Sequence, residues 1–391
     1  MATKRRRWWR GATILLVIGA AAAWAAAPYV NALALMIDVS GREVSWRSWL
    51  PVRVLPVAHE DIAVPTRHGP VTGRLYRPAG AGVSSRTVMV VPGLHAEGVD
   101  EPRLDRLGSR LAATGTTVLS LPLPDLRRFM VTPKSTDVIE DAARWLADQH
   151  TVTGSGRIGL IGISFGAGLA LVAAGRPSLT GKLDMVVSFG GYGDLPRVLR
   201  YLCTGLLPDG TRQPAHDYGT VMFLLHALPH LVPADQVAPL DRAVRVFLDA
   251  SMIDVSDPPR AAAIFRQAGA LGAALPEPAR SVMADVSARD STRLGPRLVE
   301  LAERVGGDPG VSPERSSATN VPVFLAHGAA DTVIPQTETP SLAAYLDRAP
   351  NRQNVKTEWL LTAAVSHADA TPDVPLGELW KLLRLWRKIF T

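Results

Sequence analysis

A single serine stands between two glycines in the segment Gly162-Ile163-Ser164-Phe165-Gly166, where a short apolar run gives way to a run of small residues. A strand that bends sharply into a helix at Ser164 needs glycine two residues to either side, because a side chain there would collide with the turn. Such a nucleophile elbow holds one hydroxyl above a sheet edge and leaves backbone N–H groups at the helix start free to face an anion. A chain with 33 glycines also produces this pattern by chance, so the rest of the sequence decides between a nucleophile and a turn residue.

Two later segments supply the partners that a nucleophilic serine requires. A serine hydroxyl is a weak nucleophile at neutral pH and needs a base within hydrogen-bond reach, itself oriented by a carboxylate. Asp331 stands in the loop 327–335, after an apolar strand that ends near Ala326, and His367 follows the last strand. The carboxyl ends of parallel strands share one edge of a sheet, so we expect the three side chains to meet there in the chain order Ser, Asp, His.

Other side chains compete for two of these roles. Asp194 comes just after the sixth expected strand and is an alternative acid, because a carboxylate there could also reach the histidine. His327 and His95 are the other candidates for the base. We interpret His327 as a structural residue of the acid loop and His95 as a residue that lines the pocket. Asp369, two residues beyond His367, is expected to be solvated.

Alternating strand and helix patterns position these residues. Short apolar runs bounded by turn residues predict strands, and apolar residues three and four apart predict the helices between them. Asp137 and Glu140 resemble a capping pair at the start of one such helix. Strands at this spacing indicate a mostly parallel sheet with helices on both faces, an α/β fold. The expected strands before residue 195 are 61–66, 71–76, 86–91, 117–121, 158–163 and 183–189.

The strand pattern stops between about residues 195 and 320, which predicts a helical cap inserted after the sixth strand. The apolar stretch 221–232 would either wall the site, which suits an ester with an apolar acyl chain, or form the core of the cap itself. Strands then resume at 321–326 and 355–360. The helical stretches expected within the cap are 221–231, 243–252 and 296–305.

The N-terminal segment 1–40 predicts a membrane helix. Its first ten residues are basic, no charged residue occurs from Gly11 to Ala27, and the apolar character continues to Ile37. Such a run can cross a bilayer core of about 30 Å. Basic flanks stay in the cytoplasm, so we expect an uncleaved anchor with the body outside. A signal peptide cut at the A-x-A patterns of 21–27, or a twin-arginine export signal, would also deliver the body across the membrane.

Two further segments have features of a membrane surface. Trp46 and Trp49 lie among arginines and resemble an interfacial collar, although ordinary packing explains them equally well. The last helix, expected from about Leu376, interleaves basic residues with a leucine-rich face. It would either lie on anionic lipid or pack on the sheet with its basic side chains reaching water.

Composition excludes several classes of protein. Hydrophobic residues make up 47% of the 391 residues and charged residues 20%, so the chain can bury a large core. The net charge is +6, and the first ten residues carry five of these charges, which leaves about +1 for the body and argues against nucleic-acid binding. Cys203 is the only cysteine, which excludes an intrachain disulfide and a cysteine-based zinc site.

From about residue 60 to 391 the chain resembles an α/β-hydrolase, on the strength of the elbow, the motif H-G-x-x-D-x-x-x-P at His327 and the late histidine. The resemblance implies Ser164 as nucleophile, His367 as general base and then acid, and Asp331 as its orienting carboxylate. It also implies an oxyanion hole formed by the N–H groups of Phe165 and Leu94, and it implies no metal or cofactor. Many relatives have histidine where this chain has Pro92, which puts the second donor in doubt.

The predicted organisation is an N-terminal anchor over 1–40, a hydrolase core over 41–194 and 321–391, and a helical cap over 195–320. The predicted function is a membrane-anchored, extracytoplasmic serine hydrolase that cleaves carboxylic esters through an acyl-enzyme. Its expected substrate is a small-molecule ester, which is lipid-like if the apolar stretch of the cap walls the site. A thioesterase, peptidase or acyltransferase would use the same three residues. A hydrolase-shaped scaffold without catalysis is the alternative from another class. Nothing in the sequence indicates the oligomeric state.

Overall fold

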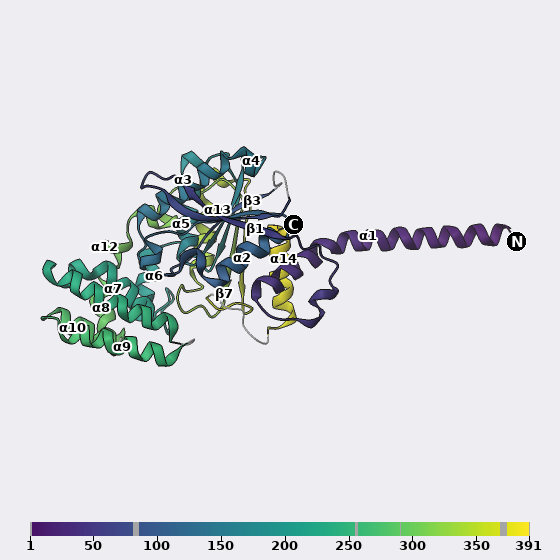
Figure 1. Ribbon diagram of the computed structural model, residues 1–391. Coiled ribbons are helices and arrows are strands. Elements are labelled where there is room, and N and C mark those ends of the chain that lie inside the picture. The colour runs from purple at the N-terminus through teal and green to yellow at the C-terminus, as the bar shows by residue number, and fades with distance from the viewer. Residues whose placement is uncertain (1, 81–85, 255–256, 290, 368–373, 391) are drawn as a thin grey trace.

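An eight-stranded sheet forms the centre of the molecule (Figure 1). The computed structural model describes residues 2–80, 86–254, 257–289, 291–367 and 374–390. The strand order is β1-β2-β4-β3-β5-β6-β7-β8, in which the pairs that involve β2 are antiparallel and all other pairs are parallel. The mostly parallel sheet predicted from the sequence is therefore confirmed. The strands are β1 (Val57–Val64), β2 (Val71–Pro78), β3 (Thr87–Val91), β4 (Thr117–Ser120), β5 (Ile158–Ile163), β6 (Leu183–Phe189), β7 (Val323–Gly328) and β8 (Thr357–Thr362).

Helices cover both faces of this sheet, and each face has its own apolar core. In β3, Val88 and Val90 point into one core, whereas Met89 and Val91 point into the other. This alternation is the two-residue period of a strand that is buried on both faces. The helices are α1 (Ala2–Ser40), α2 (Pro102–Ala113), α3 (Pro133–Ala147), α4 (His150–Thr153), α5 (Phe165–Ala174), α6 (Leu195–Thr204), α7 (Asp217–Leu231), α8 (Ala234–Ile253), α9 (Pro258–Ala273), α10 (Ala279–Ser287), α11 (Ser291–Val299), α12 (Ala302–Gly306), α13 (Glu338–Arg348) and α14 (Leu376–Phe390).

The helices α6 to α12 all lie between β6 and β7 in the chain, and α7 to α10 form a group beside the sheet (Figure 1). Four consecutive residues of α7, Met222 to Leu225, are almost completely buried. They belong to the same apolar cluster as residues of α3, α5 and α13. The insertion and this face of the sheet therefore share one continuous core, which favours the core interpretation of the stretch 221–232. The predicted helix 296–305 is wrong in its extent, because α11 ends at Val299 and α12 begins at Ala302.

The opposite face of the sheet is covered by α2, α14 and the segment 28–40 of α1. All side chains from Ala20 to Ala27 are exposed, whereas those from Pro28 to Ser40 are half-buried or buried except for Asn31, with Ala32 and Leu35 fully buried. The buried residues of α14 include Leu383 and Trp386, so this helix packs on the body. The segment Ala20–Ser40 has a mean hydropathy of 1.5 and is long and apolar enough to cross a bilayer.

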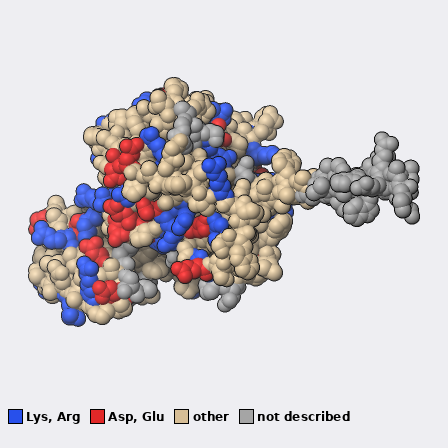
Figure 2. Space-filling view, turned by 45° about the vertical axis from the view of Figure 1, so that its right-hand side comes forward, with Lys and Arg blue, Asp and Glu red and all other residues tan. Residues whose placement is uncertain are grey.

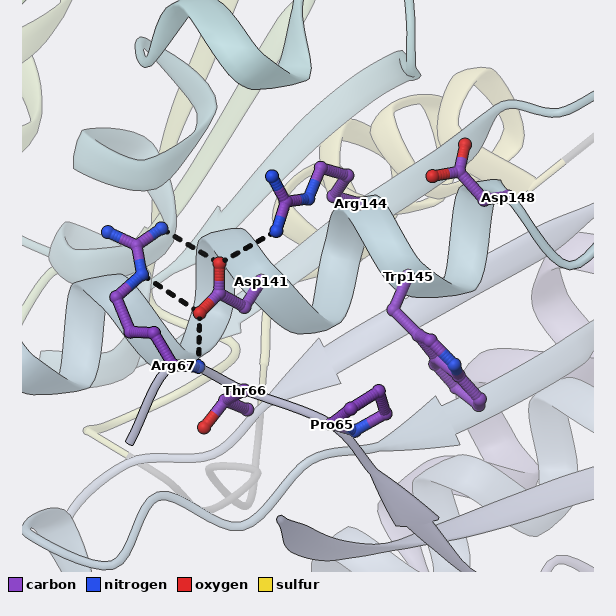
Figure 3. Close-up of a pocket in the computed structure, with 7 residues that line it drawn as sticks. All are labelled: Pro65, Thr66, Arg67, Asp141, Arg144, Trp145 and Asp148. Atoms are coloured by element: carbon purple, nitrogen blue, oxygen red, sulfur yellow. Dashed lines mark hydrogen bonds and ion pairs between the residues drawn. The ribbon is translucent and has the colours of Figure 1, made fainter. Parts of the chain in front are cut away.

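An ion-pair network joins the turn between β1 and β2 to α3 (Figure 3). Arg67 donates through Nε and Nη2 to the two carboxylate oxygens of Asp141, at 2.9 and 2.8 Å, and through Nη2 to Glu140 at 2.8 Å. Asp137 and Glu140 also bind Arg176, which lies after α5. The predicted capping role of Asp137 and Glu140 is wrong, because α3 begins at Pro133 and both acids lie within the helix.

Candidate active site

The turn from β5 into α5 holds Ser164 in an unusual backbone conformation. Its φ is 53° and its ψ is −131°, a region that residues other than glycine rarely adopt, at a cost of about 1–3 kcal/mol. The flanking glycines permit this turn. A Cβ at Gly162 would lie 2.4 Å from the Cα of Ala167, and a Cβ at Gly166 would lie 2.1 Å from the carbonyl oxygen of Pro92. The elbow geometry therefore depends on both glycines.

The structure brings Ser164, His367 and Asp331 together. Ser164 Oγ lies 2.9 Å from His367 Nε2, and His367 Nδ1 lies 2.7 Å from Asp331 Oδ2. A carboxylate only accepts hydrogen bonds, so Nδ1 carries the proton of the imidazole and Nε2 accepts from the serine hydroxyl. Asp331 follows β7 and His367 follows β8, so both come from loops at the carboxyl ends of parallel strands.

Asp331 is fully buried and bound through both oxygens. Oδ1 accepts from the backbone N–H groups of Val333 and Ile334 at 2.8 and 3.0 Å. Burial alone would raise the pKa of this carboxyl. The hydrogen bonds from His327 and His367 outweigh it and hold the pKa of Asp331 well below its usual range. The aspartate is therefore ionised whenever the histidine needs an orienting charge.

His327 stabilises the loop that carries Asp331. Its Nε2 lies 3.0 Å from the carbonyl oxygen of Ile334 and 3.2 Å from Asp331 Oδ2, and both partners are acceptors. Its Nδ1 lies 2.8 Å from the hydroxyl of Thr339 on α13. The ring therefore carries its proton on Nε2, and its hydrogen bonds hold the acid loop in place. This agrees with the structural role predicted for His327.

The loop after β3 passes directly beside the serine. A Cβ at Gly93 would lie 3.0 Å from Ser164 Cβ and 3.4 Å from its Oγ. Leu94 follows in the same loop, and Phe165 is the first residue of α5, whose N–H group has no acceptor inside the helix. Of the two residues predicted to form the oxyanion hole, Phe165 thus follows Ser164 directly in the chain, and Leu94 follows Gly93, which lies beside the serine.

The residues that competed for the roles of acid and base bind other partners in the structure. Asp194 caps α6, with Oδ1 accepting from the Arg197 N–H at 2.9 Å and Oδ2 paired with Arg315 at 2.6 Å. Both oxygens of Asp194 are thus bound by α6 and Arg315, and the carboxylate within hydrogen-bond distance of His367 is that of Asp331. His95 accepts from the N–H of Glu97 at 3.3 Å, and burial lowers its pKa. Asp369 lies outside the described residues.

Sequence patterns missed two supports of the acid loop and one glycine that lies beside its carboxylate. Gln213 Nε2 donates to the Asp331 carbonyl oxygen at 2.6 Å, and the His216 N–H donates to the Thr332 carbonyl oxygen at 2.8 Å. Both residues belong to the segment between α6 and α7, more than 100 residues away in the chain, so no local pattern could connect them. Gly190 has a φ of 58°, and a Cβ there would lie 3.5 Å from Asp331 Oδ2.

Two surface cavities are lined by residues other than Ser164, Asp331 and His367. One, of about 560 Å³, is lined by Thr66, Arg67 and α3 residues that include Trp145 (Figure 3). The other, of about 490 Å³, lies between α8 and the segment 127–129, and Ala96, two residues after Leu94, also lines it. Within the described part of the chain, no group of three or more His, Cys, Asp or Glu side chains could hold a metal ion.

Comparison with known proteins gives similarity to solved structures only. No family model and no curated protein matches the sequence. An esterase from Pyrobaculum calidifontis is 17% identical, with a TM-score of 0.45 over 93% of this chain and 87% of that one. A bacterial brefeldin A esterase, described as a homologue of human hormone-sensitive lipase, is 16% identical, with a TM-score of 0.48 over 97% and 84%. A dienelactone hydrolase from Anabaena variabilis is 15% identical, with a TM-score of 0.41 over 85% and 97%.

These proteins are less than 20% identical to the chain, so their substrates do not define its substrate. The chain's own features define its architecture. The elbow follows β5, the acid follows β7 and the histidine follows β8, in the order Ser, Asp, His. The protein has an α/β-hydrolase fold.

Proposed function

We propose that this protein is a serine hydrolase that cleaves carboxylic esters through an acyl-enzyme intermediate. The observation that carries the proposal is the hydrogen-bonded chain from Ser164 through His367 to Asp331, with links of 2.9 and 2.7 Å and the serine in a strained turn. A serine that merely formed a turn would need neither the strain nor the buried, doubly bound acid behind its histidine.

Each group has a proposed role in this reaction. Ser164 Oγ attacks the ester carbonyl as His367 Nε2 takes its proton, and the same nitrogen then donates the proton to the leaving alcohol. The ionised Asp331 stabilises the imidazolium that forms in between. Water, activated by His367, then releases the acid from Ser164. The N–H groups of Phe165 and Leu94 are the proposed donors to the oxyanion, each contributing about 3–4 kcal/mol in the transition state.

The insertion 195–320 is the proposed cap of this site. Its segment around Gln213 and His216 contacts the acid loop directly, and α7 shares the core of the sheet face that holds α5. A cap so closely joined to the acid loop would shape the pocket for the acyl or alcohol part of a small ester.

The proposed location is a membrane, with the N-terminus in the cytoplasm and the hydrolase outside. The second half of α1 packs on the body, so the lipid-crossing part must precede Pro28. The uncharged run from Gly11 to Ala27 spans about 25 Å at 1.5 Å per residue, enough for a short transmembrane helix. The basic residues before Gly11 favour the cytoplasmic side.

Labelling with a fluorophosphonate probe tests the nucleophile. The wild type should label and hydrolyse short esters, and Ser164→Ala should lose labelling and about 10⁴- to 10⁶-fold in kcat. Ser281→Ala, which removes an exposed hydroxyl on α10, is the matched control and should behave as wild type. Persistent labelling of Ser164→Ala, or a folded wild type that does not label, would refute the assignment.

A further inference from the structure

Large apolar side chains are exposed on two segments that each contact α1 near its junction with the body. Trp46 and Trp49 belong to a single 3₁₀ turn, η1 (Ser45–Trp49), which follows α1. Leu376, Leu379 and Trp380 belong to the first turns of α14. Trp49 and Leu376 are each 83% exposed, Trp380 is 51%, Trp46 41% and Leu379 38%. We call these five residues the collar. An exposed set of this kind marks an interaction surface.

Both parts of the collar are fastened to α1. The ring of Trp380 stacks on Tyr29 with 5.4 Å between centroids and 7° between planes. Arg47 of η1 forms a two-bond ion pair with Asp38 of α1, at 2.9 and 2.7 Å. The segment after α1 lies on the same side of the body as the projecting helix (Figure 1). On the face shown in Figure 2, the surface next to that helix consists mainly of uncharged residues.

The position of the collar along α1 coincides with the end of the proposed lipid-crossing part. Ala27 is the last residue of the exposed run, and Tyr29, which carries Trp380, comes two residues later. α1 is one uninterrupted helix, so no linker separates the body from the bilayer. Tyr29 and Asp38, the two residues of α1 that hold the collar, lie about 3 Å and about 16 Å beyond Ala27 along the helix, so the collar lies within about three helical turns of the lipid boundary.

The chemistry of the collar suits that boundary. Trp rings favour the interface between headgroups and acyl chains, where an apolar ring meets a polar edge. Exposed basic side chains accompany them on the same segments, among them Arg53 after η1 and Lys381 and Arg384 on α14. Near an anionic leaflet each such charge contributes attraction over about a Debye length.

We propose that the collar seats the hydrolase on the membrane surface, with its Trp and Leu side chains at the headgroup boundary of the leaflet from which α1 emerges. This proposal rests on the membrane anchor proposed above. α1, η1 and the first turns of α14 then contact the membrane together, and these three contacts fix the orientation of the body. The insertion helices α7 to α10 lie at the end of the molecule away from the projecting helix (Figure 1), so the cap faces the aqueous side.

Site-specific fluorescence tests the collar in the full chain, reconstituted in nanodiscs of zwitterionic and anionic lipid. Single cysteines at Trp49 and Leu376, made as Trp49→Cys and Leu376→Cys, are labelled with an environment-sensitive dye. The native thiol interferes little, because Cys203 is buried and burial raises its pKa to about 12. Leu206→Cys is the matched control, because this leucine is 41% exposed and lies after α6, away from the collar.

We expect blue-shifted emission at both collar positions, and stronger quenching by lipids that carry the quencher near the acyl carbonyl than by lipids that carry it at the chain end. The Leu206→Cys label should remain in water. A third label, at Ala22→Cys in the exposed part of α1, reports on the anchor itself. Quenching at Ala22→Cys with none at the two collar positions would overturn the collar and leave the anchor intact. No quenching at any position would overturn the anchor as well.

A second copy of the chain is the competing occupant of the collar, and the same samples exclude or reveal it. In that case the collar labels would be shielded from water but not quenched by lipid, and they would crosslink between copies in detergent. That result would overturn the proposal. Trp380 is left unchanged throughout, because its stack on Tyr29 also holds α1.

Discussion

The carboxylate of Asp331 serves two histidines at once, and its loss should affect activity and stability differently. Asp331→Asn keeps an oxygen for the N–H groups of Val333 and Ile334 but presents an amide N–H to His367 Nδ1. The ring then takes the wrong tautomer, so kcat should fall about 10⁴-fold with little change in KM. Steady-state kinetics on a short ester checks this, and a loss below tenfold would contradict the assigned role.

The stability effect of Asp331→Asn depends on pH. The folded pKa of Asp331 is held below its unfolded value of about 3.9, so its stabilising contribution is present above that value. It is lost as the pH falls through the lower folded pKa. Urea unfolding should therefore show a wide gap between wild type and variant at neutral pH and a narrower gap in acid. A gap independent of pH would contradict the depressed pKa.

Glycine at position 166 is a structural requirement of the elbow. Gly166→Ala places a Cβ 2.1 Å from the Pro92 carbonyl oxygen, a backbone atom that can yield only by moving the loop of the second oxyanion donor. We expect a loss of about 10²-fold or more in kcat, because a displacement of about 1 Å is enough for that. Gly159→Ala in β5, the strand that leads into the elbow, is the control, because its Cβ would meet only movable side chains, those of Met185 and Val88, at 3.2 Å. Equal kinetics for the two variants would show that the loop is not positioned by this contact.

Among the elements, α6 is fixed at the start of the insertion by one arginine. Arg197 donates to Glu338 of α13 and to Glu314, and Glu338 is completely buried. Burial raises the pKa of Glu338 and outweighs the ion pair with Arg197. Removal of the arginine would leave a buried carboxylate without its countercharge, which costs about 3–5 kcal/mol.

Arg197→Met should therefore lower the free energy of unfolding most strongly at neutral pH. A raised folded pKa means that the folded state binds more protons than the unfolded one, so stability falls as the pH rises through that pKa. Without Arg197 the folded pKa of Glu338 rises further, so the fall extends to higher pH and is larger in total, and mild acid should restore much of the lost stability. Arg200→Met on the same helix is the control, because its pair with Glu303 is about half exposed and contributes at most about 1 kcal/mol. Thermal unfolding of both variants across pH measures the difference, and equal losses would contradict the argument.

The elements also show where sequence reasoning succeeds and where it stops. Strands such as β3 and β5 were predictable, because local apolar runs between turn residues determine them. The acids of α3 were misassigned because Asp137 and Glu140 bind Arg67 and Arg176, which are distant in the chain. The roles of Gln213 and Asp194 likewise depend on partners that only the tertiary fold brings near.

On the scale of the whole molecule, α1 has an exposed part and a part that packs on the body. From Ala20 to Ala27 its side chains are exposed, whereas the segment from Pro28 to Ser40 is part of the second core, in which Leu35 is buried together with residues of α2 and α14. Burial of one leucine contributes about 1.5–3 kcal/mol, and the Tyr29–Trp380 stack contributes about 0.5–1.5 kcal/mol more. Against a typical total of about 5–15 kcal/mol, the docked half of α1 is a large share of stability.

Two truncations separate these halves. Deletion of residues 2–27 should leave a soluble hydrolase with an unchanged melting temperature, because the docked segment 28–40 remains. Deletion of residues 2–40 should uncover Leu383 and Trp386, lower the melting temperature by many degrees and favour aggregation. Calorimetry and size-exclusion chromatography of the two proteins check this, and equal melting temperatures would show that the segment only rests on the body. Since the A-x-A patterns lie within 21–27, a cleaved form would keep the docked segment, and one fold would serve both an anchored and a released enzyme.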